Sequence, residues 1–156
     1  MSHTTGDLVD STDQLTYADA DITRQALVHS SAMAYLMVAY ARECGRSPEH
    51  AADFAGRLLA KEWARFVGED AQAIARHIGL ILICIGGEIE AITGDGRHAE
   101  IRASGVLTDE DARFFGISRD EADRFCDVFV PMTAALGFAF SWRRVGDELI
   151  FTLSVP

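Results

Sequence analysis

The sequence predicts an α+β fold in which three N-terminal helices precede two β-hairpins separated by a further helix. Two observations carry this prediction. Through the first half of the chain, apolar residues recur every three or four positions, as on one face of a helix. After Gly86-Gly87 they alternate with polar residues, as in strands with one buried face. The hairpins are expected to form a four-stranded antiparallel sheet covered by helices on one side.

The first helix is expected over residues 19–43. Acidic residues crowd its N-terminal end, which suits the helix dipole, and Gly45 follows as a stop signal. Residues 26–41 carry no charge and are apolar on nearly every side, so the helix is either central or half of a subunit interface. Residues 1–18 are polar and aperiodic, which predicts a flexible tail before a single domain over 19–156.

The second and third helices have clear start signals and apolar stripes. Ser47 is the expected N-cap of the second helix, Pro48 its first residue and Gly68 its end. Its apolar stripe consists of Phe54, Leu58, Leu59 and Phe66, with Trp63 at the edge. The third helix is expected from Glu69 to Ile85, with a stripe of Ile74, Ile78, Ile81, Leu82 and Ile85.

Two hairpins and an intervening helix complete the chain. The strands "EIEAIT" and "HAEIRAS" flank the turn "GDGR", and "FAFSWRRV" and "ELIFTLSV" flank "GD". Between the hairpins, Ser118 and Glu121 form a capping box. The helix that it opens is expected to kink or break at Pro131 and to stop near Gly137.

Composition excludes several classes of protein. The 156-residue chain has a net charge of −10, which disfavours binding to nucleic acid or to an anionic membrane. Its longest uncharged run is too short and too polar to cross a bilayer. Cys44, Cys84 and Cys126 have no zinc or disulfide spacing, and the N-terminus lacks signal-peptide character. These features favour a cytoplasmic protein, and the near-exclusive use of Arg over Lys favours a bacterial one.

The Gly86-Gly87 pair is not expected to bind a nucleotide. "GGEIEA" matches neither the dinucleotide fingerprint nor the P-loop, and Glu88 and Glu90 would repel a phosphate. We interpret the pair as the joint between a helix and a strand. No cofactor is expected. A metal is not expected either, because His29 has no second ligand three or four residues away.

Residues of two regions are candidates for a ligand site. His29 shares a helix face with Met33 and Tyr40, and it is either a core histidine or the titratable group of a small-molecule pocket. Arg102 and Arg143 project from one side of the predicted sheet. They form either a solvated, ion-paired face or, if a helix covers them, a clamp for a substrate carboxylate. Trp142, on the same hairpin as Arg143, completes the predicted substrate-binding set.

Cys126 lies in "DRFCDVFVPM" without a neighbouring histidine. It is either a buried structural residue or, if a base reaches it from elsewhere in the fold, a nucleophile.

The second half of the chain resembles a known family. "GGEIEAITGDGRHAEIRASGVL" followed by "RFCDVFVPMTAALGFAFSWRRVGDELIFTLSV" is similar to the L-2-amino-thiazoline-4-carboxylic acid hydrolase-like family and, more distantly, to 4-vinyl reductase-like domains. The resemblance covers residues 55–155. It implies a helix-covered sheet with a cavity for a small organic ligand, and Cys126 carries over. Val106-Leu107 stands where the family has Cys-Pro, and Leu149-Ile150 where a cysteine is common.

The expected function is the processing of a small, partly apolar compound between the first helix and the sheet. In a hydrolase of this type, His29 would be the general base, Cys126 would be a second catalytic residue, and Arg102 or Arg143 would anchor the substrate. The alternative is a non-catalytic ligand-binding or sensory module that uses the same pocket. Either protein is expected to be a homodimer.

Overall fold

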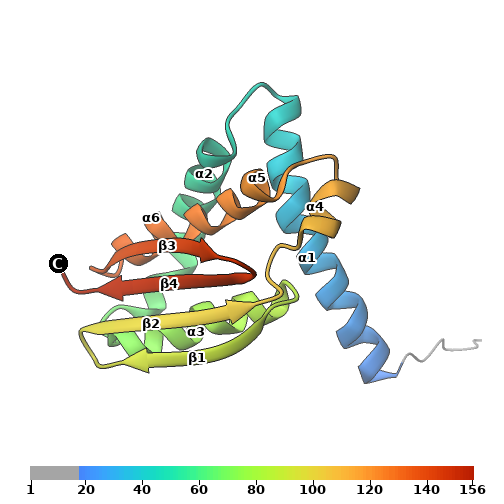
Figure 1. The fold of residues 1–156 in the computed structure, drawn as a ribbon. Helices are drawn as coiled ribbons and strands as arrows, with labels where there is room; N and C mark the ends of the chain where they lie inside the picture. The colour runs from blue at the N-terminus through green and yellow to red at the C-terminus, as the bar shows by residue number, and fades with distance from the viewer. Residues whose placement is uncertain (1–17) are drawn as a thin grey trace, which may run out of the picture.

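The computed structural model describes residues 18–156 as a layer of helices against one sheet (Figure 1). The helices are α1 (Asp19–Glu43), α2 (Pro48–Trp63), α3 (Ala71–Cys84), α4 (Asp109–Phe114), α5 (Arg119–Asp123) and α6 (Phe129–Ala134), with short 3₁₀ helices η1 (Ala64–Phe66) and η2 (Arg124–Val128). The strands are β1 (Glu88–Gly94), β2 (His98–Ser104), β3 (Ala139–Val145) and β4 (Glu148–Ser154). This arrangement confirms the predicted α+β class. The predicted tail, apart from Ala18, lies outside the described residues.

The sheet has the strand order β1-β2-β4-β3, and all its pairings are antiparallel. The second strands of the two hairpins therefore meet in the middle. Helix α3 packs on β1 and β2, and α6 packs on β3; Figure 1 shows both helices behind the sheet. On β2 the side chains of Ala99, Ile101 and Ala103 are inaccessible to solvent, whereas Arg102 between them is exposed, as the alternation predicts.

The other face of the sheet carries the two predicted arginines. The strand register places Arg102, Ile150 and Arg143 in one row across β2, β4 and β3. Ile150, between the two arginines in this row, is only 7% exposed. Arg102 forms an ion pair with Glu148, with 2.5 Å between Nη2 and Oε2. Both arginines are exposed, and Arg102 is ion-paired, as expected for a solvated face.

Gly86 and Gly87 join α3 to β1. Gly86 has a φ of 94°, which glycine adopts without strain, and the N–H of Gly87 donates to the carbonyl of Leu82 over 2.9 Å. A β-carbon on Gly87 would lie 2.4 Å from Cγ2 of Val106. The pair therefore ends α3 and lets the loop after β2 approach the backbone of Gly87 closely.

Several helix boundaries differ from the prediction. Helix α2 ends at Trp63 rather than at Gly68, and η1 continues the chain as a 3₁₀ turn to Phe66. Helix α3 begins at Ala71 because Asp70 caps it, accepting from the N–H of Ala73 over 2.9 Å. The Ser118 capping box is confirmed, but the helix that it opens breaks well before Pro131. Pro131 is the third residue of α6, in a first turn where the missing N–H costs no hydrogen bond. The predicted kink or break at Pro131 was wrong for this reason.

Helix α4 is a short element that the sequence patterns do not predict. The hydroxyl of Thr108 caps it by accepting from the N–H of Asp111, and three acidic residues occupy its first turn. It is six residues long, too short for an apolar stripe to reveal it.

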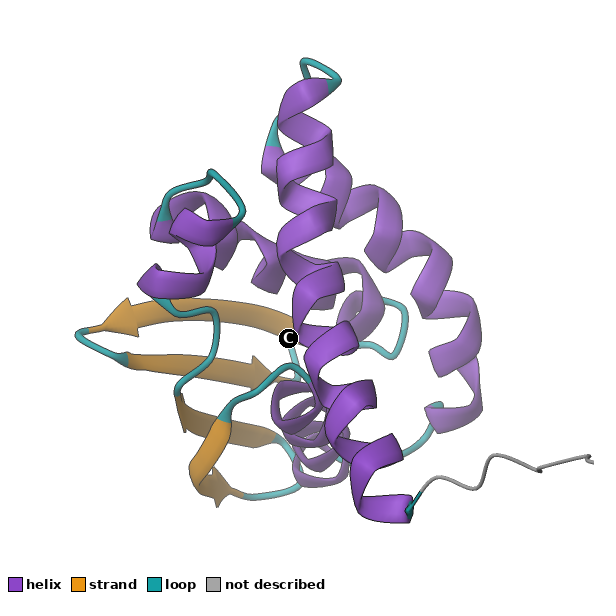
Figure 2. Cartoon of the chain, turned by 90° about the vertical axis from the view of Figure 1, so that its right-hand side faces the viewer, coloured by secondary structure: helices purple, strands orange, loops and turns teal. Residues whose placement is uncertain are grey.

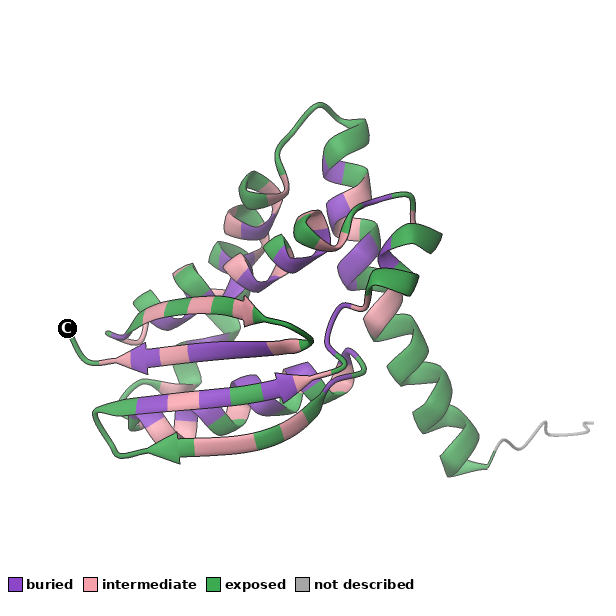
Figure 3. Cartoon of the chain, viewed as in Figure 1, coloured by how far each residue is buried: buried purple, intermediate pink, exposed green. Residues whose placement is uncertain are grey.

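Helix α1 is not central. Every residue from Asp19 to Ser30 is exposed, and Figure 3 shows this half of the helix extending away from the sheet. Only the second half packs against the protein, through Ala34, Tyr35, Val38 and Ala41. Of the two roles predicted for this helix, the central one was wrong. Within residues 18–156, no helix combines the length and apolar character that crossing a membrane requires.

A buried ion pair joins the sheet to the helices. Arg144 lies on the same face of β3 as Phe140 and Trp142, and its side chain is 13% exposed. Its guanidinium donates through Nε and Nη2 to the two carboxylate oxygens of Asp123, whose side chain is 5% exposed. Nη2 also donates to the carbonyl of Val106 over 3.0 Å. Arg144 thus links β3, the end of α5 and the loop after β2.

Replacing Asp123 by Ala is expected to lower the free energy of unfolding by about 3–5 kcal/mol, because Arg144 would remain buried without its counter-charge. Urea denaturation followed by circular dichroism measures this loss. The control is Asp147→Ala, since the Asp147 side chain is 89% exposed in its ion pair with Arg119 and should contribute less than about 1 kcal/mol. Equal effects of the two substitutions would contradict the assigned role of Asp123.

Candidate functional site

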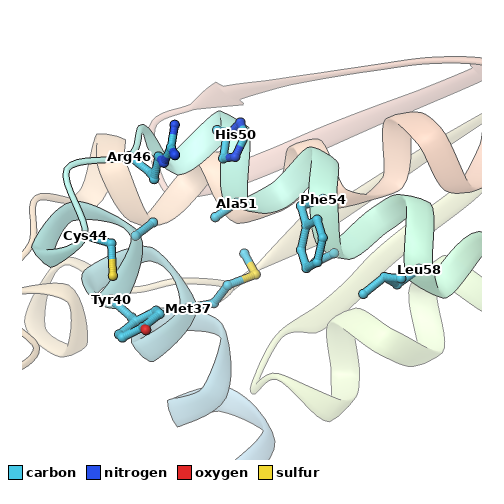
Figure 4. Close-up of a pocket in the computed structure, with 10 residues that line it drawn as sticks. Met37, Tyr40, Cys44, Arg46, His50, Ala51, Phe54 and Leu58 are labelled. Atoms are coloured by element: carbon cyan, nitrogen blue, oxygen red, sulfur yellow. The ribbon is translucent and has the colours of Figure 1, made fainter.

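The candidate site is a groove between the second half of α1 and the first half of α2 (Figure 4). Its volume is about 500 Å³, within the usual range for small-molecule sites. Ten residues line it: Met37, Tyr40, Ala41, Cys44, Arg46, His50, Ala51, Phe54, Ala55 and Leu58. We call this the α1–α2 groove.

The turn between the helices sets the direction of the groove. Ser47 caps α2, its hydroxyl accepting from the N–H of His50 over 3.2 Å, and Pro48 is the first helical residue. The other side of α2 lies against η2 and α6, where a β-carbon on Gly56 would approach the carbonyl oxygen of Val128 to 2.3 Å. This close contact holds α2 in place and leaves Phe54 and Leu58 on the opposite side.

The predicted apolar stripe of α2 is therefore not the part of the helix that is buried. Phe54 is 56% exposed and Leu58 is 49% exposed, whereas Trp63, predicted at the edge of the stripe, is only 6% exposed. Ala52 and Gly56 make the close contacts because small residues let the backbones approach. The large side chains of Phe54 and Leu58 form one wall of the groove instead.

The groove has a polar end and an apolar end. Arg46, His50 and Cys44 lie near the turn, whereas Leu58 lies at the far end, as Figure 4 shows. The chain has 24 acidic residues, but none lines the groove. Within residues 18–156, no carboxylate lies within ion-pair distance of Arg46. The guanidinium is thus available for an anionic group of a ligand.

The neighbouring Cys44 side chain raises the pKa of the Tyr40 phenol. Tyr40 is therefore neutral at physiological pH, and its hydroxyl adds a second donor near the polar end of the groove.

A second hollow of about 490 Å³ lies between α1 and α4, but its chemistry differs. The carboxylate of Asp111 borders it, and the hydroxyl of Tyr35 lies 3.5 Å from Oδ2 of Asp111. Burial raises the pKa of Tyr35. An acidic residue already occupies the polar side of this hollow, so it is a weaker site for an anionic ligand than the α1–α2 groove.

The structure does not bring the predicted site residues together. His29 and Met33 lie on the outward face of α1, where Met33 is 63% exposed and Nε2 of His29 is 2.9 Å from Nε2 of Gln25. The shallow surface around His29 is lined by residues of α1 alone. The predicted pocket between His29 and the sheet was wrong, because this half of α1 extends away from the sheet. Among the predicted residues, only Tyr40 lines the α1–α2 groove.

The predicted residues of the two hairpins lie on opposite faces of the sheet. Arg102 and Arg143 are on the exposed face, where a hydrogen bond with Glu148 raises the pKa of Arg102. Trp142 faces the helices instead, and its indole N–H donates to Asp127 over 2.8 Å. The guanidinium of Arg124 lies 5.6 Å from the centre of the indole ring. Trp142 therefore packs η2 against β3.

Cys126 is inaccessible to solvent in η2. Burial, reinforced by the nearby carboxylate of Asp123, raises the pKa of its thiol well above the usual value. A buried neutral thiol is a poor nucleophile, so the geometry agrees with the structural interpretation of Cys126.

The chain matches no protein-family model and no curated protein. The resemblance to thiazoline-carboxylate hydrolases therefore stays a prediction. Within residues 18–156, no three His, Cys, Asp or Glu side chains are grouped in a way that could hold a metal ion.

Arg46 and His50 are the site residues that the sequence patterns do not reveal. They flank the start signal of α2, where a cap and a proline explain the local sequence without any ligand. The available signal was the four-residue spacing of His50, Phe54 and Leu58, which places a polar and two apolar side chains along one line of α2, whereas Arg46 precedes the helix and carries no such signal.

Iodoacetamide is expected to alkylate Cys44 in the folded protein roughly a hundredfold or more faster than Cys126. Cys44 is exposed, whereas Cys126 reacts only through local opening that costs several kcal/mol. Peptide mapping by mass spectrometry measures both rates, with urea-unfolded protein as the control in which both thiols react. Similar rates in the folded protein would contradict a structural role for Cys126.

Proposed function

We propose that the protein is a non-catalytic module that binds a small, partly apolar ligand in the α1–α2 groove. The observation that carries the proposal is the lining of the groove. Within residues 18–156, it combines an apolar wall with a guanidinium that pairs with no carboxylate, and no lining residue is acidic. Most small-molecule sites have this anatomy, with a few polar groups that orient a ligand held largely by apolar contact.

The ligand is expected to carry a carboxylate or a similar anionic group. The guanidinium of Arg46, just before α2, offers paired N–H donors that match a carboxylate, and His50 in the first turn of α2 lines the same groove. Met37, Phe54 and Leu58 then contact the apolar part of the ligand. Such a ligand extends from the α1–α2 turn towards the far end of the groove.

The hydrolase prediction has less support than the binding module. Its proposed base, His29, is exposed on α1, and its proposed thiol, Cys126, is buried within η2. General base catalysis requires the base within hydrogen-bond reach of the group that it deprotonates. Neither residue lines the α1–α2 groove.

Titration with 1-naphthoate is expected to shift backbone amide resonances of residues 37–58 in ¹H–¹⁵N spectra. Arg46→Gln should weaken naphthoate binding about tenfold or more, because a hydrogen bond to a charged group contributes about 1.5–3 kcal/mol. The neutral analogue 1-naphthalenemethanol should be little affected by this substitution. Arg143→Gln, on the exposed face of the sheet, is the matched control.

Shifts confined to other segments, or equal effects of the two Arg substitutions, would contradict the proposed site. Incubation with 2-amino-thiazoline-4-carboxylate separates binding from catalysis. Recovery of this compound unchanged supports a binding module, whereas its hydrolysis would overturn the non-catalytic proposal in favour of the hydrolase.

A further inference from the structure

The outward face of α1 carries a regular apolar seam. Its residues are Ile22, Ala26, His29, Met33, Leu36 and Tyr40, separated by four, three, four, three and four positions. This alternation is the heptad spacing of the core positions of a coiled coil. We call these six residues the α1 seam.

The α1 seam lies opposite the face with which α1 packs on its own chain. At about 3.6 residues per turn, the six seam residues fall within an arc of about 80°. Ala34, Tyr35, Val38 and Ala41, which are buried, fall on the other side of the helix. The seam is exposed throughout, and its large residues Ile22, Met33, Leu36 and Tyr40 are 54%, 63%, 45% and 72% exposed.

Within residues 18–156, no other element packs on the first half of α1. All residues from Asp19 to Ser30 are exposed, and Figure 2 shows α1 as the outermost helix on the side facing the viewer. A helical segment of this length is marginal in water without tertiary packing. The same segment also exposes Val28, which is 56% exposed. This half of α1 is therefore expected to gain its packing from another molecule.

We propose that a second copy of the chain packs on the α1 seam, with the two α1 helices antiparallel. The seam is palindromic about residue 31, because Ile22 pairs with Tyr40, Ala26 with Leu36 and His29 with Met33 when one helix is reversed. Each of the three pairings occurs twice in a two-fold dimer, which gives six continuous layers over about 27 Å of helix.

The charges around the seam favour a second copy of the chain as the partner and an antiparallel orientation of the two helices. Arg24 lies on the opposite side of α1 from the seam. The positions directly beside the seam carry no charge, so two chains with a net charge of −10 each meet there without like-charge repulsion; these positions are Thr23, Gln25, Ser30, Ala32, Met37 and Ala39. The antiparallel arrangement opposes the dipoles of the two helices and keeps their acidic first turns apart. A parallel pair would instead bring the acidic first turns together.

The first test is the mass of the full chain in solution. Light scattering coupled to gel filtration is expected to give twice the chain mass of 17.0 kDa. Met33→Glu combined with Leu36→Glu should give a monomer with unchanged helix content. The matched control Leu80→Glu, at an exposed leucine of α3, should remain a dimer. A monomeric parent protein, as would result if residues 1–17 covered the seam, would overturn the proposal, as would a dimer of the double variant.

The second test measures orientation and register by disulfide formation in a Cys44→Ser background. Ile22→Cys and Tyr40→Cys proteins are oxidised separately and after mixing. The antiparallel pairing predicts cross-linked dimers only in the mixture, because residue 22 of one helix faces residue 40 of the other. Cross-linking of each variant with itself would show a parallel pair, and absence of cross-linking in all three samples would overturn the register. Neither test requires the α1–α2 groove to bind a ligand.

Discussion

The buried ion pair between Arg144 and Asp123 connects the two layers of the fold, and the position of the candidate groove depends on it. Arg144 faces the helices because β3 alternates, so its charge can be buried only beside a counter-charge. Asp123 supplies that charge from the end of α5 and places η2 directly above the second hairpin. The close contact of Gly56 with Val128 then sets α2 against η2. The groove is the space that remains between α2 and the end of α1.

Helix α1 has apolar residues on two opposite faces, which explains why it carries so few charges. One face is buried against the chain through Tyr35 and Val38, and the opposite face carries the α1 seam. Tyr40 belongs to both the seam and the rim of the α1–α2 groove. In the proposed dimer, Ile22 of the second copy packs on Tyr40 and narrows the open side of the groove. Dimer formation and ligand binding would then influence each other through one side chain.

Most secondary structure was predictable because its signals are local. The bounds of α1, the cap at Ser47, the capping box at Ser118 and both hairpins follow from short patterns of polar and apolar residues. Errors arose where length or packing outweighed the local signal. Helix α4 is too short to show periodicity, and the helix from Ser118 breaks where η2 packs against α2 rather than at its proline.

The candidate site was largely unpredictable because it depends on contacts between distant parts of the chain. An apolar stripe on α2 predicts burial, but the close approach at Gly56 buries small residues and leaves Phe54 exposed. His29 was grouped with the arginines of the sheet because nothing in the sequence shows that the first half of α1 extends beyond it. Only Tyr40 among the predicted residues lines the groove.

By itself, the sequence determined the fold class, the order of the elements, the uncharged character of α1 and the heptad spacing of its seam. These properties depend on neighbouring residues and on the periodicities of helices and strands. Only the tertiary structure decided which apolar faces are buried, that Arg46 has no counter-charge among residues 18–156, and which thiol is protected. Burial and charge pairing depend on distances between residues far apart in the chain, and packing alone sets those distances.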